Sequence, residues 1–165
     1  IEFERRLAEP ISRLANLLID TTKLKGARFQ DLLEDYFSKG KVDPFRITFV
    51  SFGYKHGVPK DADLLFDVRF LPNPFYVEEL RNLTGNDKAV YDYVIEKEET
   101  QIFIKKMLNL LDYLLNEYDK EGKMHLIVGI GCTGGQHRSV SLTNYFADHY
   151  SKYYQVHRLH RDADH

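Results

Sequence analysis

The residues best suited to chemistry lie in one run, Gly131-Cys132-Thr133-Gly134-Gly135-Gln136-His137-Arg138-Ser139-Val140. The run follows a strongly apolar segment and precedes a segment with helical spacing, which predicts a strand-to-helix turn. Such a turn gathers free backbone amides and the positive end of a helix dipole, and its glycines let an anion approach the backbone. We therefore predict a phosphate-binding loop made of Cys132, Thr133, Gly134, Gly135, Gln136, His137, Arg138 and Ser139. The alternative is a glycine-rich turn that only reverses the chain.

Arg138 is the strongest candidate for contact with the anion. Its guanidinium can bind two phosphate oxygens at once, while the hydroxyls of Thr133 and Ser139 add donors without charge. We expect Arg138 to be a surface residue in the first turn of the helix. Arg138→Ala should then weaken ligand binding far more than folding, which should change by only about 0.5 kcal/mol.

The same loop has the spacing of a cysteine-dependent phosphatase, because Cys132 is followed after five residues by Arg138 and Ser139. In such enzymes a thiolate attacks phosphorus inside a ring of amides. Cys-x5-Arg is a weak pattern, however, and free cysteines are commonly buried and inert. No other loop offers an evident general acid. Catalysis by Cys132 is therefore an alternative to binding without reaction, and no catalytic residue is assigned.

Two other segments are expected to join this loop, because ligands of open α/β sheets bind beyond the carboxyl ends of the strands. The first contributes Ser51, Gly53, Tyr54, Lys55 and His56. The second contributes Asp67, Arg69 and Asn73. Each group also has a simpler explanation. Lys55 and His56 can be solvated, Asp67 and Arg69 can form a structural ion pair, and Asn73 can form a turn.

Histidines and arginines alternate near the end of the sequence, from His157 to His165. His157 and His160 are three residues apart on a predicted strand and would point to opposite faces, which is poor geometry for one metal ion. We predict no metal site. Arg161 or His160 is expected to reach the anion from the rim, unless this end of the chain is frayed.

Residue patterns predict the elements that position these loops. Strands are expected at residues 46–52, 63–70, 125–130 and 153–159, and helices at residues 87–96, 99–120 and 139–150. The continuous apolar run Leu126-Ile127-Val128 is typical of a central strand in a parallel sheet. In the long helix we expect one buried stripe of Phe103, Met107, Leu110, Leu114 and Tyr118. The alternation predicts an α/β fold, layered, with a largely parallel sheet and helices on both faces.

The first part of the chain has a different pattern. Leu7, Ile11, Leu14 and Leu18 have helical spacing, a short extended stretch follows, and residues 24–39 have the pattern of an amphipathic helix before Gly40. Pro44 disfavours helix in the residue before it. We therefore predict two domains, residues 1–42 and residues 45–165.

Composition limits the classes of function. The chain has 23 Lys+Arg against 25 Asp+Glu, a net charge of -2 and a pI of about 6.4, so no global positive field attracts nucleic acid. The single cysteine excludes an internal disulfide and a cysteine-rich zinc site, and it fits a reducing, cytoplasmic compartment. No segment has the pattern of a signal peptide or a membrane-spanning helix, so no membrane partner is expected.

The sequence resembles the carboxy-terminal half of the RapZ/YvcJ family of bacterial P-loop-containing regulators. The resemblance covers residues 46–162 and rests on three runs, Ser51-Phe52-Gly53-Tyr54-Lys55, Phe66-Asp67-Val68-Arg69-Phe70-Leu71-Pro72-Asn73-Pro74 and the loop from Gly131 to Val140. Residues 1–42 resemble the last helix, strand and helix of the family's nucleotide-binding domain. We expect the chain to be the carboxy-terminal part of such a protein, cut away from most of its P-loop domain.

The resemblance implies a non-catalytic regulatory domain. It is expected to bind a phosphorylated metabolite such as glucosamine 6-phosphate and to signal to its own nucleotide-binding domain or to a partner, as a homo-oligomer. The family's ATP or GTP site is a Walker A loop, and no such motif occurs in these 165 residues. We therefore expect no cofactor in this chain, and nucleotide hydrolysis only in the full-length family.

The resemblance also implies an alternative function, an RNA-binding adapter, because enterobacterial members bind a small RNA and present it to an RNase. Those members use a strongly basic tail, whereas this sequence has Asp162-Ala163-Asp164-His165 at that place. A chain without a lysine-rich stripe lacks what binding by counterion release needs. RNA is therefore disfavoured as a partner.

Overall fold

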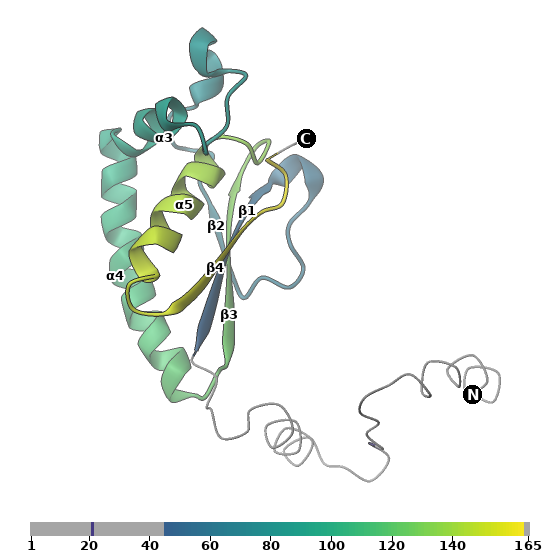
Figure 1. Ribbon diagram of the computed structural model, residues 1–165, viewed down its shortest axis with the longest axis vertical. Helices are drawn as coiled ribbons and strands as arrows, with labels where there is room; N and C mark the ends of the chain where they lie inside the picture. Colours follow the sequence, from purple (N-terminus) through teal and green to yellow (C-terminus); the bar gives the residue numbers. More distant parts are fainter. Residues whose placement is uncertain (1–20, 22–44, 164–165) are drawn as a thin grey trace, which may run out of the picture. The chain divides into compact units, whose positions relative to one another are not determined.

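Four parallel strands form one sheet in the computed structural model, which describes residue 21 and residues 45–163. The strands are β1 (Arg46–Gly53), β2 (Leu64–Asp67), β3 (His125–Cys132) and β4 (Gln155–His160). They lie in the order β2-β3-β1-β4 (Figure 1). The predicted α/β fold with a parallel sheet is confirmed, and β3 is a central strand as its apolar run predicts.

Three α-helices connect the strands, α3 (Lys88–Ile95), α4 (Glu98–Lys120) and α5 (Arg138–Tyr150). Each begins and ends within one residue of its predicted range. Three short 3-10 turns precede them, η1 (Tyr54–His56), η2 (Pro74–Tyr76) and η3 (Glu78–Leu80). No helix in the described part of the chain is long and apolar enough to cross a membrane.

Two strands are shorter than predicted, for local reasons. β2 ends at Asp67, because the Asp67 side chain accepts the backbone amide of Arg69 and the chain turns there. β4 begins at Gln155, because the amides of Tyr153 and Tyr154 both donate to the carbonyl of Tyr150 at the end of α5. These residues of high β propensity therefore extend the helix end instead of the strand.

The buried face of α4 is rotated by one residue from the predicted stripe. The core contains Ile104, Met107, Leu111 and Leu115, which belong to one cluster with Leu126, Val128 and Ile130 of β3. Leu110, expected in the core, is exposed. The sequence does not decide which stripe of α4 is buried. Leu110-Leu111 and Leu114-Leu115 are adjacent pairs, so apolar spacing fits two neighbouring stripes equally well.

Figure 1 shows α4 and α5 on one side of the sheet and the segment between β1 and β2 on the other. On that second side the ring of Phe52 lies against the backbone of β3, since a Cβ atom at Gly131 would be 2.4 Å from it. The sequence predicted helices on both faces. In residues 45–163 the second face carries a loop with the short turn η1 instead.

The predicted elements at residues 7–18, 16–22 and 24–39 lie outside the described residues, except for Thr21. The described residues from Phe45 onward belong to one compact unit, Pro44–His165. The division into two domains stays a prediction.

Candidate functional site

The three predicted loops meet at the carboxyl ends of β1, β2 and β3. In the sheet register Gly53 pairs with Cys132, and Asp67 pairs with Gly131, so the strands end side by side. The loop after β1 is joined to the loop after β3 by a backbone hydrogen bond, which the amide of Lys55 donates to the carbonyl of Thr133 at 3.2 Å. We call residues 132–138 the anion loop. Sheet topology therefore brings together segments that are far apart in sequence.

Gly135 is required by the conformation of the anion loop. Its φ is +85°, and a Cβ atom there would be 2.7 Å from the nitrogen of Gly53 and 2.8 Å from the Cβ of Asp162. Any side chain would therefore be strained and would also collide with two neighbouring segments. The glycine lets the loop pack closely against the end of β1.

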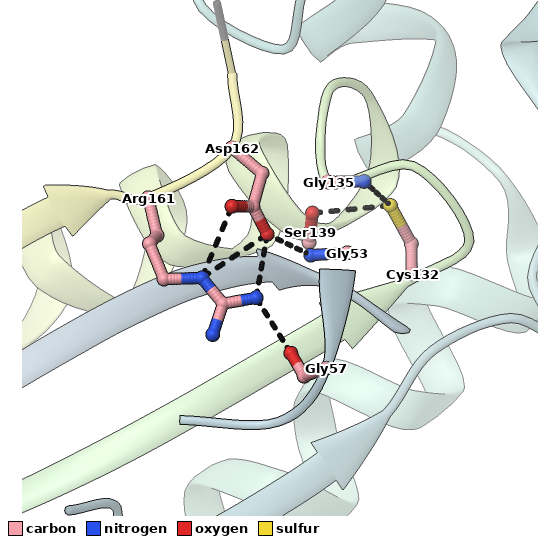
Figure 2. Close-up of polar contacts among 7 residues, drawn as sticks. All are labelled: Gly53, Gly57, Cys132, Gly135, Ser139, Arg161 and Asp162. Atoms are coloured by element: carbon pink, nitrogen blue, oxygen red, sulfur yellow. Dashed lines mark hydrogen bonds and ion pairs between the residues drawn. The ribbon is translucent and has the colours of Figure 1, made fainter. Parts of the chain in front are cut away.

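The sulfur of Cys132 is a hydrogen-bond partner inside this loop (Figure 2). It accepts the backbone amide of Gly135 at 3.2 Å and lies 3.1 Å from the hydroxyl oxygen of Ser139. The residue is only 3% exposed. Cys132 and Ser139 thus hold the loop to the start of α5.

Arg138 is buried, with 5% of its surface exposed, which corrects the expectation of a surface arginine. Its Nη1 donates to the carbonyl oxygens of Arg69 at 2.6 Å and Leu71 at 3.0 Å, and Nη2 donates to the hydroxyl of Thr133 at 3.4 Å. Within the described residues Nε has no hydrogen-bond partner, and no carboxylate forms an ion pair with the guanidinium. A buried cation without a contacting carboxylate favours the approach of an anion.

A cleft of about 350 Å³ opens at the anion loop. It is lined by Lys55, Asn73, Phe75, Tyr76, Cys132, Thr133, Gly134, Gln136, His137 and Arg138. The lining holds two cations and no carboxylate, so its charge suits a phosphate. In the described residues no three or more histidine, cysteine, aspartate or glutamate side chains are grouped so that they could hold a metal ion.

His137 adds a neutral polar group to the cleft. Burial of the imidazole lowers the pKa of His137 from its ordinary value of 6.5, although the backbone carbonyls of Leu83 and Arg81 act in the opposite direction. At neutral pH the ring is therefore uncharged. The positive charge of the cleft comes from Lys55 and Arg138.

Several predicted site residues support the loops without lining the cleft. Ser51 lies 2.9 Å from Nδ1 of His160 through its hydroxyl, and the Tyr54 ring lies under the guanidinium of Arg69 at 4.1 Å. Arg69 forms an ion pair with Asp67 at 2.7 Å. The hydrogen bond from Arg69 holds the pKa of Asp67 below its ordinary value. This is the structural ion pair considered above as the simpler explanation.

Of the other predicted site residues, Gly135 belongs to the anion loop, Gly53, Ser139 and Arg161 lie outside the cleft lining, and His56 is exposed on η1. Arg161 donates to Asp162 at 2.7 Å and to the carbonyl of Gly57 at 2.6 Å. It therefore does not line the cleft from the rim as expected. Asn73 forms the turn considered above, because its side chain accepts the amide of Phe75 at 3.3 Å, and it also lines the cleft.

The aromatic rim of the cleft and the buried acid behind the anion loop are not among the predicted site residues. Phe75 and Tyr76 line the cleft, and Tyr76 is 82% exposed. Two adjacent exposed aromatics after the rigid run Pro72-Asn73-Pro74 were a usable signal. Asp162 is 3% exposed and contacts the anion loop, but nothing in the sequence distinguishes it from a residue of a frayed terminus.

The chain is similar to known proteins over nearly its whole length. The family model of the RapZ C-terminal domain matches residues 45–164. A nucleotide-binding protein of Clostridioides difficile (strain 630) is 48% identical over 165 residues, 99% of this chain and 58% of the relative. One of Lactobacillus acidophilus is 51% identical over 162 residues, 98% of this chain and 55% of the relative. One of Staphylococcus aureus (strain JH9) is 48% identical over 165 residues, 99% of this chain and 54% of the relative. The chain thus spans little more than half the length of these relatives.

Proposed function

Because the chain belongs to the RapZ/YvcJ family and contains its C-terminal domain, we propose that it is a regulatory domain that binds a phosphorylated metabolite at the anion loop. The observation that carries the proposal is the buried guanidinium of Arg138, which no carboxylate contacts in the described residues. Lys55 lies at the same cleft. A phosphate dianion would offset both charges and accept hydrogen bonds from the loop.

An amino-sugar phosphate such as glucosamine 6-phosphate suits the rest of the cleft. A volume of about 350 Å³ lies in the range of small-molecule sites. Phe75 and Tyr76 offer flat rings beside a sugar, and the side chains of Asn73 and Gln136 can bond its hydroxyls. No acidic side chain lines the cleft, so the amino group would meet amide oxygens or aromatic faces.

The domain would signal to a nucleotide-binding domain of the full-length protein. The relatives carry the name nucleotide-binding protein, and each is longer than this chain. In this proposal the full-length protein hydrolyses ATP or GTP at its P-loop, and the domain described here reports whether the metabolite is bound. The domain itself performs no catalysis.

A cysteine-dependent phosphatase is the second candidate, favoured by the contacts of Cys132 with the Gly135 amide and the Ser139 hydroxyl. Hydrogen bonds of this kind stabilise a thiolate. The cleft, however, holds no carboxylic acid to protonate a leaving group. We therefore favour binding without reaction. No contact in the described residues favours an RNA-binding adapter.

Titration calorimetry with the 165-residue chain tests the proposal. Glucosamine 6-phosphate, glucose 6-phosphate and inorganic phosphate should bind, and unphosphorylated glucosamine should not. A comparison of the two sugar phosphates then measures the contribution of the amino group. Equal binding of glucosamine with and without phosphate, or binding of none of the phosphorylated compounds, would overturn the proposal.

A further inference from the structure

The carboxylate of Asp162 lies behind the anion loop, outside the cleft, and is almost fully buried. Its Oδ2 accepts the backbone amide of Gly53 at 2.7 Å, at the point where β1 ends. Both of its oxygens accept hydrogen bonds from Arg161, at 2.7–3.2 Å. Figure 2 shows these contacts beside those of Cys132. Asp162 thus ties the segment after β4 to the end of β1.

Asp162 also touches the anion loop directly. A Cβ atom built on Gly135 would lie 2.8 Å from the Cβ of Asp162 and 2.7 Å from the nitrogen of Gly53. The three residues are therefore packed so closely that none can shift without moving the others. The amide of Gly135 in turn donates to the sulfur of Cys132, which lines the cleft. A continuous chain of contacts leads from Asp162 to the cleft wall.

The ion pair is itself anchored at both ends. The amide of Arg161 donates to the carbonyl of Ser51 at 3.0 Å, and its Nη2 donates to the carbonyl of Gly57. Burial opposes ionisation of Asp162, but the hydrogen bonds from Arg161 and Gly53 outweigh burial and lower the pKa of Asp162. The carboxylate is therefore charged at neutral pH, as this network requires.

We propose that Asp162 is a positioning residue, which fixes the anion loop in its ligand-binding form by holding Gly53 and Gly135 together. It contacts no ligand and acts through Gly135 and Cys132. The ligand-binding part of this proposal rests on the function proposed above. The effect on the loop does not, because loop order can be measured without any ligand.

Asp63 supplies a matched control. Its carboxylate also accepts a strand amide, that of Ile127 at 2.8 Å, and also pairs with a cation, Lys123 at 2.8 Å. It precedes β2, at the opposite end of that strand from the cleft. Asp63→Asn and Asp162→Asn therefore remove equivalent chemistry at two places, and only the second touches the anion loop.

The first measurement is the rate at which a chromogenic aromatic disulfide reacts with Cys132, the single cysteine of the sequence. If Asp162 orders the loop, the rate rises in Asp162→Asn and rises further, by about tenfold, in Asp162→Ala, the effect of losing one charge-assisted hydrogen bond. Asparagine still offers an oxygen to Gly53, so it should partly rescue the loop. Asp63→Asn should react like the parent.

The second measurement is the dissociation constant for glucosamine 6-phosphate and for inorganic phosphate, well below each variant's unfolding temperature. Binding should weaken by about tenfold in Asp162→Ala and remain unchanged in Asp63→Asn. If the labelling rates follow the expected order but no phosphate binds the parent, the proposed function fails and the positioning role stands. If Asp162→Asn and Asp63→Asn lower thermal stability alike while labelling of every variant, Asp162→Ala included, stays at the parent rate, Asp162 is merely structural and the proposal is overturned.

Discussion

Replacing Arg138 by lysine separates the two roles that the structure gives to this side chain. Its guanidinium holds the carbonyls of Arg69 and Leu71, and it also supplies a buried positive charge to the cleft. The first role means that the expected stability change of about 0.5 kcal/mol, typical of a surface arginine, does not apply to Arg138→Ala. Alanine removes both roles, whereas lysine keeps the charge and loses the planar fork.

The magnitudes follow from these contacts. In Arg138→Ala two carbonyl oxygens lose their donor, and at about 1–3 kcal/mol for each buried unsatisfied group we expect a loss of about 2–4 kcal/mol, because water relieves part of the cost. Lysine can still donate to one carbonyl, so Arg138→Lys should cost about 1–2 kcal/mol. Phosphate binding should weaken about 10- to 100-fold in the alanine variant and about tenfold in the lysine variant.

Thermal unfolding and titration calorimetry on the same preparations check both effects. Arg158 provides the control, since it lies on β4, bonds Asn144 and pairs with Asp148 on the surface, and does not line the cleft. Arg158→Lys should leave affinity unchanged. The reasoning is refuted if Arg138→Ala, measured below its unfolding temperature, binds glucosamine 6-phosphate and inorganic phosphate as tightly as the parent, because Arg138 would then be purely structural.

Three further outcomes are expected. Cys132→Ser should keep phosphate affinity within about twofold, because a hydroxyl can still accept the Gly135 amide, and an aryl phosphate assay of the parent should show no turnover; turnover lost in the serine variant would establish the phosphatase. Gly135→Ala should lower the melting temperature far more than Gly57→Ala, since both residues have φ of +85° but only at Gly135 would a Cβ atom collide with its neighbours. Equal decreases in melting temperature would contradict the packing argument. The folded-state pKa of His137 is below its unfolded value of 6.5, so its contribution to stability is present above pH 6.5 and is lost as pH falls through the folded pKa. His137→Gln should therefore make the melting temperature depend less on pH between about pH 7 and 5. A pH dependence of the melting temperature equal to that of the parent would exclude this role.

The sequence predicted the positions of the described strands and helices well, because periodicity, proline and glycine mark them strongly. It failed where two solutions share one pattern. Paired leucines in α4 left the buried stripe undecided, and the β propensity of Tyr153 and Tyr154 hid their hydrogen bonds to Tyr150. Both decisions depend on tertiary packing, which local propensity does not contain.

The site was predictable to the level of loops but not of side chains. Sheet topology guarantees that the ends of parallel strands meet, so the anion loop and the segment that carries Lys55 were correctly placed together. Which polar groups face the cleft depends on competing partners nearby. Asp67 forms an ion pair with Arg69, and Asp162 forms one with Arg161, so neither arginine lines the cleft. Arg138 contacts no carboxylate in the described residues, and it lines the cleft.

The contacts around the anion loop also bear on how binding could be signalled. Arg138 is fixed by carbonyls, Cys132 by Gly135 and Ser139, and Gly135 by Gly53 and Asp162, all through contacts within the protein. A loop that is already ordered loses little conformational freedom on binding, so most of the interaction with phosphate appears as affinity. A ligand changes a protein's state only through contacts that differ between its states. In the proposed function, since the loop has little freedom to differ, a bound sugar would alter the surface that another domain detects at the exposed aromatic rim of Phe75 and Tyr76.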